Sequence, residues 1–255
     1  LEGTPRYAGT GIWEANPRIV EDLDTAGLLV ASGEVVHSYP HCWRCKNAVI
    51  FRATVQWFLG LDHRGLRERA LEEIGDVQWV PPGTVNRITT MVQGRPDWCL
   101  SRQRTWGVGI PAVYCRRCDE PLLDPAVIRH VAARVRDEGS DVWFSAGVAE
   151  LLPEGTHCAA FGAEAHEFRR EIEILDVWFD SGASQRAVLE RREDLTWPAD
   201  VYLEGPDQHR GWFNSSLILA VATRDAAPYR AVVTHGWIVD ARGRAMHKSE
   251  GNVIS

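Results

Sequence analysis

The sequence predicts an α/β fold with a parallel sheet, and three observations support this. The last part of the chain alternates a strand-like run at 201–203, a helical run at 211–223 and a strand-like run at 231–235. Such alternation is typical of β-α-β units, which build parallel sheets. The 255 residues suffice for one large domain or two small ones. Their 45% apolar share is ordinary for a globular protein with a packed core.

The N-terminal part is expected to hold one short helix and two strands. Residues 9–12 are strand-like. Asn16 then fits the N-cap of a helix and Pro17 its first residue, because proline is tolerated where no amide hydrogen is needed. Strand-like runs follow at 35–39 and 49–54, with a turn between them.

The middle of the chain is expected to be more helical. We predict a helix over 55–74, a break at the Pro-Pro-Gly of 81–83 and a second helix over 84–92. Residues 97–110 are dense in Trp, Arg and Gly, and we interpret them as a loop and strand near a site. A further strand is expected at 174–179.

Residues 111–173 differ from their surroundings and are interpreted as an insertion. They contain a cysteine pair, a predicted helix near 124–138 and a polar turn around 155–165. The chain has six cysteines, namely Cys42, Cys45, Cys99, Cys115, Cys118 and Cys158. Two Cys-x-x-Cys pairs in a chain without an export signal suggest metal or redox chemistry before disulfides.

Charge and hydropathy limit the function classes. The net charge of −7 argues against a surface that grips nucleic acid everywhere, although arginine clusters at 102–104 and 242–244 leave a local patch open. No apolar run approaches the ~18 residues of a membrane span, and residues 1–6 lack the features of an export signal. We therefore expect a cytoplasmic protein without a membrane partner.

Polar residues follow the strand at 201–203. Ligands of open parallel sheets bind at the carboxyl ends of strands, where Glu204 and Gly205 lie, and Gly205 lets the backbone approach a ligand closely. Asp207, Gln208 and His209 come next, at the start of the expected helix. A carboxylate there can hold a ribose hydroxyl or an amino group, and a helix N-terminus favours phosphate. A capping cluster without any ligand is the plainer alternative.

Four runs in one order carry a family resemblance: Asp176-Val-Trp-Phe-Asp-Ser-Gly182, the segment 202–213, Thr234-His-Gly-Trp237 and Met246-His-Lys-Ser249. Together they resemble the C-terminal half of the Rossmann-type nucleotide-binding domain of class I aminoacyl-tRNA synthetases of the isoleucine, valine and leucine group. The runs at 38–45, 51–58 and 95–107 resemble the isoleucine-specific members most. Specificity for valine or leucine stays open as an alternative.

The resemblance implies ligands and site residues. It implies ATP with Mg²⁺, isoleucine and tRNA(Ile) as ligands, and Lys248 as the catalytic residue that neutralises the phosphates as pyrophosphate leaves. Trp178 and Trp212 are implied to lie near the amino-acid pocket, although both are equally compatible with an ordinary core. Contacts with the adenylate or ATP are implied for Glu204, Gly205, Asp207, Gln208, His209, His235, Lys248 and Ser249.

Two features depart from the family pattern. The family loop reads Lys-Met-Ser-Lys-Ser, whereas this chain has Ala245 at the first lysine and His247 at the first serine. The second departure is an incomplete set of zinc ligands, because relatives bind a tetrahedral zinc ion with two Cys-x-x-Cys knuckles. Cys115 and Cys118 find only Cys158 opposite them, with His157 or His166 as substitutes. Cys42 and Cys45 lack the partner pair of zinc-bearing relatives, so zinc stays open at both sites.

The resemblance also implies a division of the chain. We expect 1–50 to be a remnant of the editing domain and a return linker, 51–110 a second-half catalytic region, 111–173 a zinc-ribbon-like insertion, 174–235 the catalytic β-α-β unit and 236–255 the start of a stem-contact segment. The family's phosphate-binding motif on the first β-α unit has no counterpart in the 255 residues. We therefore expect the missing N-terminal half to be a partner and the isolated chain to be inactive. A noncatalytic zinc-ribbon or tRNA-binding module of synthetase ancestry is the alternative.

Overall fold

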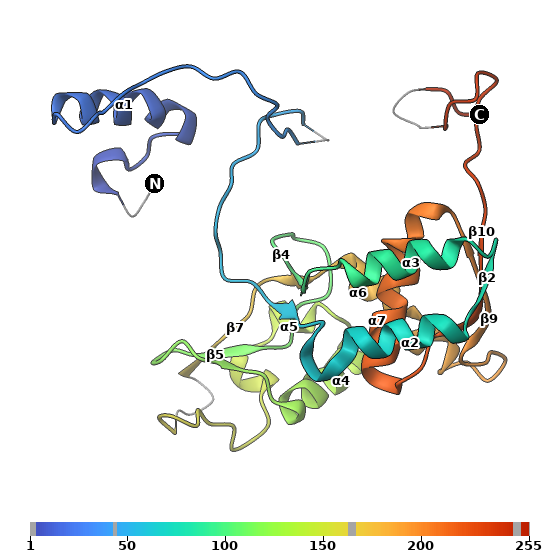
Figure 1. The fold of residues 1–255 in the computed structure, drawn as a ribbon. Coiled ribbons are helices and arrows are strands. Elements are labelled where there is room, and N and C mark those ends of the chain that lie inside the picture. Colours follow the sequence, from blue (N-terminus) through green and yellow to red (C-terminus); the bar gives the residue numbers. More distant parts are fainter. Residues whose placement is uncertain (1–3, 43–44, 163–166, 247–250, 255) are drawn as a thin grey trace. The chain divides into compact units, whose positions relative to one another are not determined.

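The computed structural model describes residues 4–42, 45–162, 167–246 and 251–254 (Figure 1). The chain divides into two compact units, residues 1–54 and 55–255, which are described separately. None of the helices in these described ranges is long and apolar enough to cross a membrane.

The first unit contains a 3-10 turn, η1 (Pro5–Tyr7), and one helix, α1 (Ile12–Thr25). The prediction that this helix starts at Asn16 is wrong, because Gly11 is its N-cap and Pro17 lies inside it. Pro17 is the sixth residue of the helix, where it supplies no amide hydrogen to the hydrogen-bond ladder. Residues 9–11 do not form a strand.

The two strands expected at 35–39 and 49–54 are absent from the described part of this unit. A single isolated bridge joins His41 and Ala48, supported by a 2.8 Å bond from the Cys42 amide to the Asn47 carbonyl. A strand needs a partner that continues the hydrogen bonding over several residues, and this segment has only a tight turn.

The second unit contains a parallel sheet in the order β2-β10-β9, formed by β2 (Gln78–Val80), β9 (Ala199–Glu204) and β10 (Tyr229–Thr234). Helix α7 (Trp212–Arg224) connects β9 to β10. The predicted α/β class and the β-α-β unit are thereby confirmed. The central strand is β10, so Glu204 ends a strand at the edge of the described sheet.

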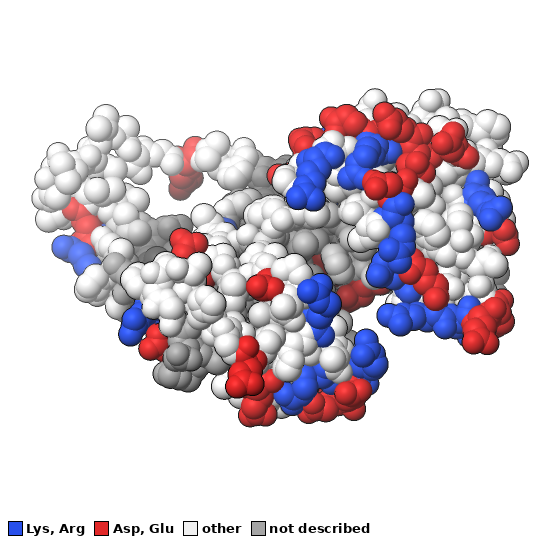
Figure 2. Space-filling model, turned by 90° about the horizontal axis from the view of Figure 1, so that it is seen from below, with Lys and Arg blue, Asp and Glu red and all other residues white. Residues whose placement is uncertain are grey.

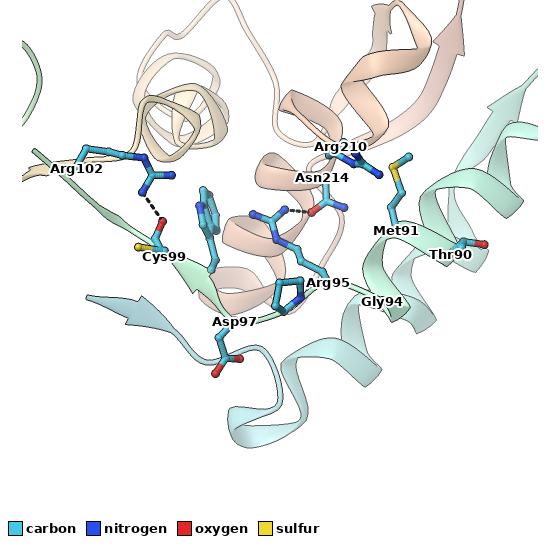
Figure 3. Close-up of a pocket in the computed structure, with 11 residues that line it drawn as sticks. Thr90, Met91, Gly94, Arg95, Asp97, Cys99, Arg102, Arg210 and Asn214 are labelled. Carbon is cyan, nitrogen blue, oxygen red and sulfur yellow. Dashed lines mark hydrogen bonds between the residues drawn. The ribbon is translucent and has the colours of Figure 1, made fainter. Parts of the chain in front are cut away.

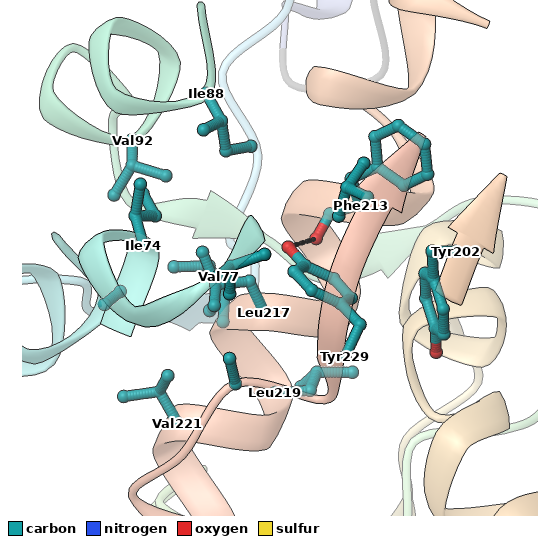
Figure 4. Packing of buried hydrophobic residues seen from close by; sticks show 14 of the residues in the cluster. Ile74, Val77, Ile88, Val92, Tyr202, Phe213, Leu217, Leu219, Val221 and Tyr229 are labelled. Carbon is teal, nitrogen blue, oxygen red and sulfur yellow. Dashed lines mark hydrogen bonds between the residues drawn. The ribbon is translucent and has the colours of Figure 1, made fainter. Parts of the chain in front are cut away.

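Helices α2 (Leu66–Asp76), α3 (Thr84–Gln93) and α7 all lie on one side of this sheet (Figure 1). Residues 213–221 of α7 are buried without interruption, and they include the polar Asn214, Ser215 and Ser216 beside apolar side chains. Figure 4 shows the core around Phe213 and Leu217, where the Tyr229 hydroxyl donates a 3.0 Å hydrogen bond to the Phe213 carbonyl.

The described residues of this unit leave the opposite face of the sheet partly exposed. Tyr202 points into the core, whereas its neighbours Val201 and Leu203 are 52% and 56% exposed. Val80 on β2 is also exposed. Parallel sheets normally bury both faces, so this face agrees with the expectation that another part of a larger domain packs there.

Two element predictions in this unit need correction. Residues 55–65 are not helical: they form β1 (Phe58–Leu59) and the 3-10 turn η2 (His63–Gly65), because Gly65 adopts a left-handed φ of 65° that interrupts a helix before α2. The strand expected at 174–179 ends after β8 (Ile174–Leu175) and is followed by helix α6 (Val177–Gly182). The Asp176 carboxylate accepts the Trp178 amide and caps this helix.

The cysteine-bearing segment has a buried cluster of its own, which includes Phe168, Trp143 and Leu151. It comprises β5 (Val113–Cys115), β6 (Pro121–Leu122), α4 (Pro125–Glu138), α5 (Val142–Ser145), η3 (Val148–Leu151) and β7 (Phe168–Arg170). The strands pair antiparallel in the order β6-β5-β7. The expected helix near 124–138 is confirmed, with Asp124 as its N-cap.

The remaining elements are β3 (Trp98–Cys99), β4 (Ser101–Arg102), the π-helical turn η5 (Gln185–Leu189) and the 3-10 turn η6 (Pro206–His209). Basic and acidic side chains lie interspersed on the face that Figure 2 shows. This mixture fits the expectation that any nucleic-acid contact is local.

Candidate functional site

A pocket of about 430 Å³ lies at the carboxyl end of β9. Glu204 and Gln208 line it from the strand end and from η6, and Trp178 and Trp212 line it from α6 and α7. These four residues were singled out from the sequence, and the fold places them around one cavity. The remaining lining residues are Ser181 and Ser184.

Trp212 is held in a fixed orientation. Its indole Nε1 donates to the Ser181 carbonyl at 3.0 Å and to the Ser184 Oγ at 3.2 Å. Its ring stacks on Tyr202, with centroids 3.9 Å apart and planes 11° from parallel. Stacking on a buried partner leaves the indole as a flat apolar wall. Tyr202 and the two serines were not predicted as site residues, although Tyr202 and Ser181 lie within the runs 202–213 and 176–182 that carry the family resemblance.

Trp178 packs against the backbone at Gly211. A Cβ atom on Gly211 would lie 2.9 Å from Trp178 Cη2 and 2.6 Å from Gln208 Oε1, closer than real contacts allow. Gly182 allows α6 and α7 to approach closely, because a Cβ atom at this position would lie 2.8 Å from the Ser215 carbonyl carbon. These two glycines therefore set the spacing of the helices that carry the tryptophans.

The turn from Gly205 to His209 is internally hydrogen-bonded. The Gln208 Oε1 accepts the Trp212 amide at 2.8 Å, and its Nε2 donates to Asp207 Oδ2 at 2.8 Å. Gln208 therefore caps α7, and its contact with an adenylate stays a prediction. The Glu204 carboxylate is exposed and has no hydrogen bond or ion pair to any residue described.

Gly205 is buried between polar side chains. Its Cβ would lie 2.9 Å from Asp207 Oδ1 and 3.6 Å from His235 Cε1. The glycine thus makes room for both side chains near the strand end. His235 is exposed, with its Nδ1 2.7 Å from the Gly236 carbonyl.

His209 is buried in the core and does not line the pocket. Its ring contacts Trp79 and Phe213, and its Nε2 lies 3.5 Å from Thr234 Oγ1. Nδ1 has no hydrogen-bond partner in the described residues. Burial, with a smaller effect of Arg87, lowers the pKa of His209 to about 4. Its direct contact with an adenylate stays a prediction, and the geometry favours a role in positioning the turn.

The low pKa of His209 predicts a pH dependence of stability. The unfolded chain binds a proton near pH 6.5 and the folded chain only near pH 4, so stability falls as the pH drops through this window. The slope is at most about 1.4 kcal/mol per pH unit. Urea unfolding between pH 7 and 4.5 should show this loss in the parent chain and much less of it in His209→Leu. Equal slopes in both would contradict the prediction.

The buried Asp176 anchors several segments beside the pocket. It accepts the Trp98 indole at 2.9 Å and pairs with Arg102 at 2.9 Å. Gln103 donates to Glu173 at 2.7 Å. Of the arginine cluster noted in the sequence, Arg102 is thus part of an internal network, and Arg104 is exposed.

The loop before the expected phosphate lysine is a turn organised by Asp240. Its carboxylate accepts the amides of Arg242 and Arg244 at 2.9 and 3.0 Å and pairs with the Arg244 guanidinium. Hydrogen bonds from Arg244 and its neighbours lower the pKa of Asp240. Lys248 and Ser249 lie outside the described residues.

Three cysteine thiols converge in the insertion. Cys115, Cys118 and Cys158 place their sulfurs within 4.8 Å of one another, with Cys118 and Cys158 3.7 Å apart. Tetrahedral zinc with sulfur bonds of ~2.3 Å separates its ligands by ~3.8 Å, so three corners fit. Amides of Cys118 and Arg117 lower the pKa of Cys115. Among described residues no other group of this kind forms, and His157 is turned to the Gly155 carbonyl.

Comparisons with known proteins identify the family to which the chain is similar. A family model described as tRNA synthetases class I (I, L, M and V) matches residues 19–255. The isoleucine–tRNA ligases of Kosmotoga olearia and Carboxydothermus hydrogenoformans are 54% and 55% identical over 98% and 99% of this chain. The chain spans 27% of the length of each. A structure of Mycobacterium tuberculosis methionyl-tRNA synthetase bound by methionyl-adenylate aligns over 87% of this chain and 33% of its own, at 17% identity and a TM-score of 0.49.

Proposed function

The chain belongs to the class I tRNA synthetases, and we propose that it forms the second half of the catalytic domain of an isoleucine–tRNA ligase. The activity would be ATP-dependent formation of isoleucyl-adenylate, followed by transfer of isoleucine to tRNA(Ile). The observation that carries the proposal is the pocket shared by Trp178, Trp212, Glu204 and Gln208.

The pocket supplies suitable chemistry for an aminoacyl-adenylate. Two indole walls offer a branched aliphatic side chain apolar contact without hydrogen-bond requirements. The Glu204 carboxylate has no hydrogen bond or ion pair to a described residue, and it suits an ammonium group or a ribose hydroxyl. Asp207 follows it on the same turn. Lys248 would neutralise the phosphates as pyrophosphate leaves, with Mg²⁺ bound to ATP.

We propose a division of labour along the chain. Residues 51–110 and 174–235 would be catalytic, 111–173 a zinc-ribbon-like insertion, 236–255 the start of a stem-contact segment and 1–50 an editing-domain remnant with its return linker. The first half of the domain would cover the apolar sheet face at Val80, Val201 and Leu203 and complete the ATP site. The 255 residues alone would then be inactive.

Isoleucine-dependent pyrophosphate exchange tests this proposal. The purified chain should give no exchange with ATP, Mg²⁺ and isoleucine, and co-expression with the N-terminal half of the Kosmotoga olearia relative should restore it. Valine and leucine should support less exchange than isoleucine. Robust exchange by the chain alone would contradict the claim of inactivity, and a preference for leucine or valine would contradict the substrate.

We also propose that Cys115, Cys118 and Cys158 bind one zinc ion, whose role is to tie the knuckle to the loop at Cys158. A fourth ligand would come from His157, His166 or water. Cys42 and Cys45 would need two ligands from outside this segment, as the sequence suggested.

Zinc binding predicts a measurable effect on stability. Metal analysis should find about one zinc per chain, and a chelator should lower the melting temperature of the insertion. Cys115→Ser should remove both the metal and the chelator effect, because a buried thiolate is lost. Cys99→Ser, outside the cluster, should change neither. Equal zinc content in all three proteins would rule the site out.

A further inference from the structure

A second hollow, of about 520 Å³, lies apart from the candidate site (Figure 3). Arg210 and Asn214 line it, whereas Trp212, between them on the chain, lines the candidate site. Arg95 and Arg102 reach the same hollow from the segment after α3 and from β4. Three arginines, from the segment after α3, from β4 and from the turn before α7, therefore line one cavity.

Arg95 is fixed by neutral partners. Its guanidinium lies over the Trp98 ring, 4.6 Å from the centroid, and its Nη1 donates to Asn214 Oδ1. It forms no ion pair with any described residue. Burial lowers the pKa of Arg95, and the negative charge of Asp176 partly opposes this shift. A desolvated cation without a contacting carboxylate favours an external anion.

The other charges at the hollow leave it positive. Arg210 is exposed, and its side chain has no hydrogen bond or ion pair in the described residues. Arg102 is neutralised by Asp176. Asp97 is the one carboxylate among the lining residues, and its Oδ1 already accepts the Leu61 amide at 2.9 Å. Figure 3 shows the Asp97 carboxylate pointing away from the Arg95 guanidinium.

The positive region continues along α3. A neighbouring hollow of about 590 Å³ shares Thr90 and Met91 with the first and is lined by Arg87. Helix α3 contains no acidic residue. Arg87, Arg95 and Arg210 thus lie along two adjoining hollows, which suits a ligand with successive phosphates better than a single small anion.

We propose that the two adjoining hollows bind the phosphodiester backbone of a single-stranded RNA segment, with Arg95 and Arg210 contacting one phosphate and Arg87 contacting another. The choice of RNA rests on the proposed function, whereas the choice of phosphate rests on the arginines alone. Arg95 acts as the preorganised contact, since Trp98 and Asn214 already restrict its side chain. Arg210 and Arg87 add exposed, salt-sensitive contacts.

Binding of a fluorescein-labelled hexanucleotide RNA to the 255-residue chain, followed by anisotropy over a range of KCl concentrations, tests the proposal. Arg210→Gln should weaken binding several-fold and reduce the salt slope by roughly 0.7, the value for one lost single-strand phosphate contact. Arg87→Gln should do the same. Arg129→Gln, an exposed arginine on α4 that removes the same charge, is the matched control and should leave the slope unchanged.

Arg95→Gln should weaken binding most, and its circular dichroism and melting curve report whether the fold survives. A parallel titration with inorganic pyrophosphate separates the two sources of phosphate. If the RNA affinity is unchanged in Arg210→Gln and Arg87→Gln while the pyrophosphate affinity falls, RNA is the wrong ligand. If neither titration depends on them, the hollow is not a phosphate site. Because no step needs adenylation, these outcomes are independent of the pyrophosphate-exchange result.

Discussion

Replacing Trp212 by alanine is expected to abolish measurable isoleucine-dependent pyrophosphate exchange in the chain complemented with its first half. The substitution removes one wall of the pocket together with the stack on Tyr202 and the bonds to Ser181 and Ser184. Tryptophan-to-alanine changes in packed sites cost ~3–5 kcal/mol. A loss of this size in the binding of the amino acid alone corresponds to more than about a hundredfold in affinity.

Two further variants separate the wall from its hydrogen bonds. Trp212→Phe keeps an aromatic face but cannot donate to Ser181 or Ser184, so we expect exchange to fall about tenfold, as for the loss of ~1.4 kcal/mol. Trp106→Ala, at an indole that is 93% exposed, should leave exchange unchanged. If Trp212→Ala keeps normal exchange and a normal Michaelis constant for isoleucine, Trp212 is a core residue and the pocket assignment is wrong.

Asp176→Ala is expected to be the most destabilising single change at a polar residue, by ~2–4 kcal/mol in urea unfolding. It would remove the cap of α6, worth ~1 kcal/mol, and leave the buried Trp98 indole without an acceptor, which costs ~1–3 kcal/mol. Asp176 accepts from Trp98, Arg102 and Trp178, so one carboxylate joins β3, β4 and α6.

The matched control is another aspartate paired with an arginine. Asp194 bonds to Arg192 at 2.8 Å but is 64% exposed, so Asp194→Ala should cost at most ~1 kcal/mol. Tryptophan fluorescence against urea concentration measures both variants. If Asp176→Ala and Asp194→Ala lower the free energy of unfolding by similar amounts, burial of the Asp176–Arg102 pair does not add to stability.

The candidate site was predictable to the extent that its residues follow one strand end in the sequence. Glu204 ends β9, and Gln208 and Trp212 follow within eight residues, so the prediction of a parallel sheet already placed all three near the carboxyl end of that strand. His209 belongs to the same run but turns into the core. Its burial depends on Trp79 and Phe213, which pack around it from β2 and α7. The local sequence pattern does not predict these contacts.

Elements with local signals could be predicted from the amino-acid sequence. The Pro-Pro-Gly break, the capped helix α4 and the β9-α7-β10 alternation depend on backbone geometry and periodicity within a few residues. The sequence also carried the ordered runs that mark the family. The prediction of strands at 35–39 and 49–54 was wrong, because a strand needs a partner that supplies hydrogen bonds. No segment described in that unit does so.

Contacts between side chains from distant segments could not be predicted in this way and became visible in the folded chain. Arg95 and Arg210 lie far apart along the chain, yet α7 brings Asn214 against Arg95 and thereby Arg210 to the same hollow. Cys158 likewise reaches Cys118 through the packing of the insertion. The physical reason is that contacts between distant segments depend on how buried surfaces fit together, which the local pattern of residues does not specify.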